Sequence, residues 1–163
     1  ALPHVQNYRK ANPLIVKYWD WHQKWMARAA ITHDPLHEVE LASGRRIRYF
    51  HPESHADAKG RASYNAEIIC GESKMRRWFF GGKLTENEMQ ATARDVMRDG
   101  ILEAEDRGIP THFTVHDELV TSVPTDQAED AKRELENLLP TAAKWALDCP
   151  LGVEVKISDR YMK

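Results

Sequence analysis

The sequence has little cysteine and no long hydrophobic run. Its 163 residues include two cysteines, Cys70 and Cys149, which lie far apart. Such sparse cysteines are typical of free thiols in a reducing cytosol, although a disulfide between them stays open. No apolar run approaches the roughly 20 residues that a membrane-spanning helix needs, and the segment 1–4 is unlike a signal peptide. These absences favour a cytoplasmic protein without a membrane partner.

The composition is that of a soluble globular chain, with 42% hydrophobic and 29% charged residues. The length fits one domain of ordinary size. Although the net charge is −2, residues 1–80 carry 13 basic and 8 acidic side chains, whereas residues 81–163 carry 10 and 17. This asymmetry suits a protein that binds a polyanion on one side and metal cations on the other, and ordinary scatter of surface charge explains it equally well.

A long helix is predicted near the N-terminus. Asn12 as N-cap and Pro13 as first helical residue mark its start, and it continues to about residue 31. Residues 5–11 are read as the tail of a preceding helix. Apolar residues recur at spacings of three and four and are expected to face the core rather than to stack on bases: Leu14, Tyr18, Trp21, Trp25 and Ala29.

Two β-hairpins are predicted next, from residues 38–41 with 45–50 and from residues 63–69 with 74–80, separated by a loop at 51–60. Arg46 and Arg48 share one face of their strand, which suits phosphate contacts or a merely solvated face. Basic and aromatic residues interleave in the last strand, a weak sign of nucleic-acid binding.

A second long helix has the form of a capping box, with Thr85 as N-cap and Glu88 reaching back, and it is expected to end near residue 106, before Gly108. Asn87, Gln90, Arg94 and Arg98 fall on one polar face. Such side chains can contact a DNA minor groove and phosphates, and the alternative is a solvated face.

The segment 111–124 reads as two strands rich in β-branched residues, folded back on His116, Asp117 and Glu118. An imidazole and two carboxylates at a hairpin tip can hold a divalent metal, and a charged surface turn is the alternative. Thr125 is expected to cap a helix to about residue 139, followed by a helical piece at 141–147 and a strand at 151–157. Three late strands and two helices predict an α+β fold, in which helices cover one face of an antiparallel sheet.

Three stretches then carry a resemblance: Gly81-Gly82-Lys83-Leu84-Thr85-Glu86-Asn87, the run from Gln90 to Asp95, and Val115-His116-Asp117-Glu118-Leu119-Val120. Together with residues 8–13, 43–47 and 151–155, they resemble the C-terminal part of family A DNA polymerases, the relatives of bacterial DNA polymerase I, and among them the phage members. The resemblance implies that residues 1–80 are the end of the fingers and that residues 81–163 are the C-terminal portion of the palm, with its antiparallel sheet and His-Asp-Glu hairpin.

The resemblance also implies roles for individual residues. Asp117 matches the aspartate that binds the catalytic Mg²⁺ ions, His116 the histidine against the primer terminus, and Glu118 a supporting carboxylate. Gln90 matches a glutamine in the minor groove of primer–template DNA. The remaining candidate DNA contacts, which do not align cleanly or rest on charge alone, are Asn87, Arg94, Lys83 and Arg46.

Two-metal transfer of a nucleotide needs a second aspartate, because neighbouring strand residues such as Asp117 and Glu118 point to opposite sides. In these polymerases the other metal-binding strand and the nucleotide-binding fingers helix lie upstream. We therefore expect a fragment, or one subunit of a polymerase encoded in two parts, that needs the upstream polypeptide to act on primer–template DNA and dNTP. A DNA-binding or assembly module without chemistry is the alternative, and a nuclease would need a further carboxylate cluster.

Overall fold

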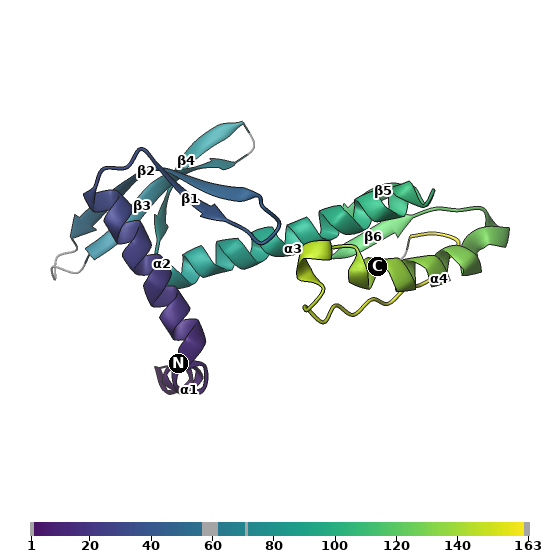
Figure 1. Cartoon of the computed structure of the whole chain (residues 1–163), viewed down its shortest axis with the longest axis horizontal. Coiled ribbons are helices and arrows are strands. Elements are labelled where there is room, and N and C mark those ends of the chain that lie inside the picture. The colour runs from purple at the N-terminus through teal and green to yellow at the C-terminus, as the bar shows by residue number, and fades with distance from the viewer. Residues whose placement is uncertain (1, 57–61, 71, 162–163) are drawn as a thin grey trace. The chain divides into compact units, whose positions relative to one another are not determined.

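The computed structural model describes residues 2–56, 62–70 and 72–161 (Figure 1). It confirms an α+β protein with an antiparallel sheet. The chain divides into two compact units, Ala1–Ala91 and Thr92–Lys163, and helix α3 (Gly81–Asp106) runs through the boundary between them. No helix in the described ranges is long and apolar enough to cross a membrane.

The first unit begins with two consecutive helices, α1 (Leu2–Ala11) and α2 (Pro13–Ile31), as the sequence predicts. Asn12 occupies the N-cap position of α2, as predicted, but its side chain has a different role from the one expected. Its side chain makes no capping bond to α2, and its Nδ2 instead donates to the carbonyl oxygen of Tyr8 at 2.9 Å. Asn12 therefore closes the end of α1, while Pro13 opens α2.

The buried face of α2 confirms only the later part of the predicted aromatic stripe, because Ala29 is buried and Trp25 is half-buried against the core. The buried residues are His22, Met26, Ala29 and Ala30. By contrast, the stripe residues Leu14, Tyr18 and Trp21 are 76%, 36% and 49% exposed. Small alanines let a helix approach a sheet closely, which favours inward packing of the face that carries Ala29 and Ala30.

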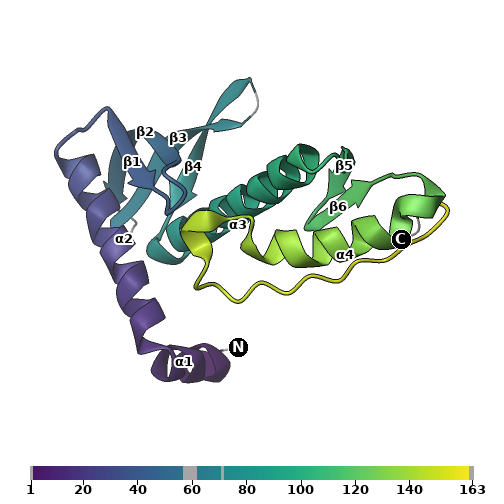
Figure 2. The same ribbon diagram turned by 45° about the vertical axis from the view of Figure 1, so that its right-hand side comes forward.

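A four-stranded antiparallel sheet, in the order β1-β2-β3-β4, lies against α2 (Figures 1 and 2). Both predicted hairpins are confirmed. The loop predicted after residue 50 is wrong, because β2 continues with a register irregularity between Phe50 and Glu53, and residues 57–61 lie outside the described part. The strands are β1 (Leu36–Glu40), β2 (Arg46–Ala56), β3 (Ala62–Cys70) and β4 (Ser73–Phe79). Their core contains Met26, Ala30, Val39, Tyr49, Tyr64, Ala66, Phe79 and Leu84.

Helix α3 begins at Gly81, four residues before the predicted N-cap. Thr85 is already inside the helix, where its Oγ1 donates to the carbonyl oxygen of Gly81 at 3.0 Å. The amide of Gly81 donates instead to Oε1 of Gln23 at 2.7 Å. The predicted capping box is therefore wrong, because a side chain from α2 satisfies the helix start.

The second unit holds a hairpin of β5 (Thr111–Val115) and β6 (Glu118–Thr121), followed by α4 (Ala128–Leu138). Helix α4 confirms the helix expected at 126–139, but Thr125 opens a 3-10 turn rather than capping it. The helical piece expected at 141–147 is confined to the 3-10 turns η2 (Leu139–Thr141) and η3 (Lys144–Ala146). Cys149 is a free, exposed thiol.

The strand predicted at 151–157 is absent from the described chain, so β5 and β6 form a two-stranded sheet. Val155 from this segment instead packs against the second core, which consists of Ala104, Ile109, Leu135 and Leu138. An alternating pattern predicts which residues can face a core, but a strand also needs an edge that pairs with its backbone.

Candidate functional site

The site of greatest chemical interest is the tip of the β5–β6 hairpin. Val115 faces Glu118 and Thr114 faces Leu119 in antiparallel register, which leaves His116 and Asp117 as the turn. The backbone φ of His116 is +53°, in the left-handed region. A residue other than glycine in this region costs about 1–3 kcal/mol and is concentrated at functional sites. The hairpin thus keeps an imidazole where a glycine would be less strained.

The two carboxylates at the tip have different surroundings. Asp117 is exposed and makes no hydrogen bond or ion pair with any residue that the structure describes. Glu118 accepts a hydrogen bond from the hydroxyl of Tyr161 at 3.1 Å. Asp117 is consequently the carboxylate available to a cation, while Glu118 is already engaged.

A complete metal cage does not form. Within the described ranges, no three His, Cys, Asp or Glu side chains gather in a way that could hold an ion. Mg²⁺ in phosphate chemistry is commonly bound by one or two carboxylates, with substrate phosphates and water completing the octahedron. Asp117 fits the role of one such ligand.

The hairpin rests on a hydrophobic base and on the C-terminal segment. Leu119 and Val123 pack against the second core. The ring of Tyr161 meets that of Phe113 edge-on, with centroids 5.4 Å apart. Desolvation and the hydrogen bond to Glu118 raise the pKa of Tyr161. Sequence reasoning missed this tyrosine, and its only signal was an aromatic residue in an otherwise polar tail.

The predicted DNA-contacting residues of α3 are only partly free. Gln90 and Arg94 are exposed and make no hydrogen bond or ion pair with described residues. Asn87 is half-buried, and its Nδ2 donates to the hydroxyl of Tyr49 at 3.2 Å. Gln90 and Arg94 are therefore available to a ligand, whereas the amide group of Asn87 is held in place.

The two remaining candidates are ion-paired. Lys83 lies 2.9 Å from Oε2 of Glu86. Arg46 lies 2.9 Å from Glu40 and 3.2 Å from Glu38 on the neighbouring strand. A phosphate at either cation would have to compete with these carboxylates.

A partly buried polar cluster joins α2 to α3 beside Asn87. Glu88 accepts hydrogen bonds from the hydroxyl of Tyr18 at 2.7 Å and from Nε2 of His22 at 2.8 Å. His22 is 1% exposed. Desolvation by burial, and to a smaller extent the hydrogen bond to the Glu88 carboxylate, raise the pKa of Tyr18 above its ordinary value. Glu88 thus serves as a tertiary acceptor instead of the predicted capping residue.

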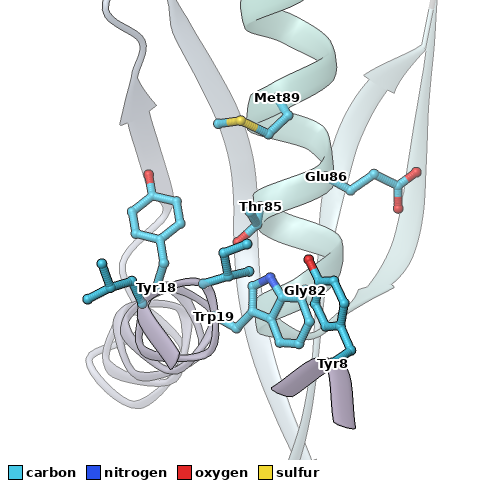
Figure 3. Close-up of a pocket in the computed structure, with 9 residues that line it drawn as sticks. Tyr8, Tyr18, Trp19, Gly82, Thr85, Glu86 and Met89 are labelled. Atoms are coloured by element: carbon cyan, nitrogen blue, oxygen red, sulfur yellow. The ribbon is translucent and has the colours of Figure 1, made fainter. Parts of the chain in front are cut away.

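An open, mainly apolar groove of about 570 Å³ lies in the same unit. Figure 3 shows the side chains that line it: Tyr8 of α1, Tyr18 and Trp19 of α2, and Thr85, Glu86 and Met89 of α3. Its only lining carboxylate is Glu86, which pairs with Lys83. The groove therefore offers aromatic and aliphatic surface rather than metal ligands.

Comparison with known proteins places this hairpin in context. The family model described as DNA polymerase family A matches residues 54–163. The DNA polymerase of Bacillus phage SP02 is 31% identical over 179 aligned residues, which cover 98% of this chain and 27% of that protein. The thermostable DNA polymerase I of Thermus filiformis is 35% identical over 169 aligned residues, which cover 96% of this chain and 17% of that protein.

This chain thus spans about a quarter or less of the length of these relatives. No solved structure matches it significantly. The family model takes in the whole β5–β6 hairpin and α3, and the similarity to the phage polymerase extends over nearly the entire chain. The chain belongs to DNA polymerase family A.

Proposed function

We propose that this chain is the C-terminal part, or a C-terminal subunit, of a DNA-directed DNA polymerase that works in template-dependent replication. The observation that carries the proposal is the exposed, unpaired Asp117 at the hairpin tip of a chain in this family. The chain matches about a quarter of the phage polymerase, so we propose that it needs an upstream polypeptide for activity. The phage relative favours the cytoplasm of a bacterial or phage-infected cell.

In this proposal Asp117 is a Mg²⁺ ligand. Asp117 would hold Mg²⁺, two ions of which belong to the complete site, and the metal would supply activation of the primer 3′-hydroxyl and charge stabilisation of the leaving pyrophosphate. Asp117 supplies a carboxylate at an exposed position, and Glu118 is held by Tyr161. Because this chain offers one free carboxylate at the tip, a second aspartate comes from the upstream polypeptide.

The remaining residues of the proposed site hold the primer–template. His116 is kept at the tip by the turn, where we assign it to the primer terminus. Gln90 can both donate and accept, which suits the acceptors of the DNA minor groove. We assign weaker phosphate or groove contacts to the other candidates: Arg94, Asn87, Lys83 and Arg46.

The test is a reconstitution of the two parts. The chain is mixed with the matching upstream polypeptide, primer–template, dNTPs and Mg²⁺, and primer extension is followed on a gel. Extension is expected from the mixture and from neither part alone. Asp117→Asn keeps the side-chain shape but removes the charge, so we expect a loss of at least about 100-fold in rate with unchanged DNA affinity.

Asp148→Asn is the matched control, because Asp148 is also exposed and lies outside the hairpin. It should extend primers at the rate of the unmodified chain. Normal extension by Asp117→Asn would remove Asp117 from the chemistry and would leave a DNA-binding or assembly module as the better description.

A further inference from the structure

The outward face of α2 carries a line of cations around an exposed indole. Lys17, Trp21, Lys24 and Arg28 recur at spacings of four, three and four, which places them on one side of a helix. All four are exposed. By helical periodicity they lie on the side of α2 opposite to Met26, which is buried in the core. We call these four residues the α2 strip.

The cations of the α2 strip differ from several others in the first unit. Arg46, Arg76 and Lys83 are each paired with one or more glutamates. In the part of the chain that the structure describes, Lys17, Lys24 and Arg28 have no ion-pair partner. The sole acidic residue of α2 is Asp20, so the strip keeps a net positive charge.

Aromatic rings accompany the cations. Tyr18 and Trp21 stack in parallel, with centroids 5.7 Å apart and planes within 9°. The ring of Trp21 also lies against that of Trp25, with centroids 4.8 Å apart. Trp21 is nevertheless 49% exposed, so a flat ring from a ligand can reach its indole. An exposed aromatic among cations is the combination with which proteins bind single-stranded nucleic acid without sequence preference.

We propose that the α2 strip binds single-stranded nucleic acid, with phosphates on Lys17, Lys24 and Arg28 and a base stacked on Trp21. The eleven-residue interval from Lys17 to Arg28 covers about 16 Å of helix, enough for about five nucleotides of a strand that rises 3.4 Å each. A base must be unpaired to stack on a side chain, so duplex binds less tightly. This site does not depend on the polymerase chemistry proposed above.

The test measures binding of fluorescein-labelled dT12 to the chain by anisotropy at several salt concentrations. Each phosphate contact to a single strand contributes about 0.7 to the slope of log affinity against log salt. The variant K17Q/K24Q/R28Q is therefore expected to lower the slope by about 2 and each single variant by about 0.7. The control Lys144→Gln alters an exposed lysine outside the strip and should leave the slope unchanged.

The stacking contact is tested separately. Trp21→Leu keeps apolar packing against Tyr18 and Trp25 but removes the aromatic ring, and it should weaken dT12 binding at least about fivefold, whereas Trp21→Tyr should retain most of the affinity. Unfolding curves of both variants check that the unit stays folded. The proposal is overturned if the triple variant binds as before, if Trp21→Leu has no effect, if duplex DNA binds equally well, or if poly-glutamate competes as strongly as dT12.

Discussion

Replacement of Glu88 by alanine is expected to destabilise the first unit strongly. The change leaves Nε2 of His22, in a side chain that is 1% exposed, without its acceptor at 2.8 Å. A buried donor left unsatisfied costs about 1–3 kcal/mol. Loss of the bond from Tyr18 adds less than about 1 kcal/mol, because water can reach a side chain that is 36% exposed. We therefore expect Glu88→Ala to cost about 3 kcal/mol and Glu88→Gln, which keeps an acceptor, about 1 kcal/mol.

The assay is urea unfolding followed by tryptophan fluorescence. Four of the five tryptophans, at positions 19, 21, 25 and 78, lie in Ala1–Ala91, so the signal reports mainly on that unit. With a slope of about 2 kcal/mol per molar urea, 3 kcal/mol moves the midpoint by about 1.5 M. The control Glu86→Ala removes an exposed pair with Lys83 and should cost less than about 0.5 kcal/mol.

A double-mutant cycle with His22→Ala isolates the contact itself. Since the two side chains touch, their coupling energy should reach about 1–3 kcal/mol. If Glu88→Ala shifts the midpoint no more than Glu86→Ala does, or if the coupling is near zero, then Glu88 does not hold α2 against α3.

Three further outcomes are expected. The pKa of Tyr18 is raised in the folded state, so its contribution to the free energy of unfolding is complete below the unfolded pKa of 10.0 and is lost as pH rises beyond that value. Tyr18→Phe should therefore reduce the loss of stability at alkaline pH, measured by urea titrations at several pH values. Tyr161→Phe frees Glu118 and should slow extension by the reconstituted enzyme about two- to tenfold, visible in kcat rather than in DNA affinity. His116→Gly relieves a left-handed backbone and should leave thermal stability equal or up to about 1 kcal/mol higher, whereas His112→Gly, inside β5, should lower it by about 1 kcal/mol.

Local sequence patterns predict best those helices and strands whose bounds are set by residues inside the same segment. Pro13 opens α2, and the β-branched strands of 111–115 and 118–121 fold back where the pattern indicates. The prediction of a capping box was wrong because residues far away in the sequence bond to Glu88. Glu88 bonds to Tyr18 and His22, which lie 70 and 66 residues away in the chain, and these contacts outcompete a local bond to the helix start.

The predictions for the first three residues of the α2 stripe and for the final strand were wrong for a related reason. Apolar residues occupy more than one face of α2, so periodicity alone does not say which face the sheet will cover. Residues 151–157 alternate as a strand would, yet Val155 joins a core without backbone pairing. Both outcomes depend on the partner element, which a pattern inside one segment does not contain.

In the candidate site, too, local features could be predicted and distant contacts could not. His116, Asp117 and Glu118 are adjacent in sequence, so motif and turn could be predicted together. Tyr161 reaches Glu118 from 43 residues away, and no spacing rule connects them. The sequence also did not show which polar side chains are free to bind a ligand. Arg46 and Gln90 are both exposed, but Arg46 is paired with glutamates, whereas Gln90 has no partner among the described residues.

The junction of α2 and α3 explains why so many predictions about this region changed together. A Cβ at Gly81 would lie 1.9 Å from the carbonyl oxygen of Trp19, so only glycine lets the two helices approach this closely. That approach brings Gln23 to the amide of Gly81, and His22 and Tyr18 to Glu88. The start of α3 is therefore set by α2. Because Gln90 lies only two residues beyond Glu88, any change that loosens this junction should disturb its proposed contact with DNA before it touches the chemistry at Asp117.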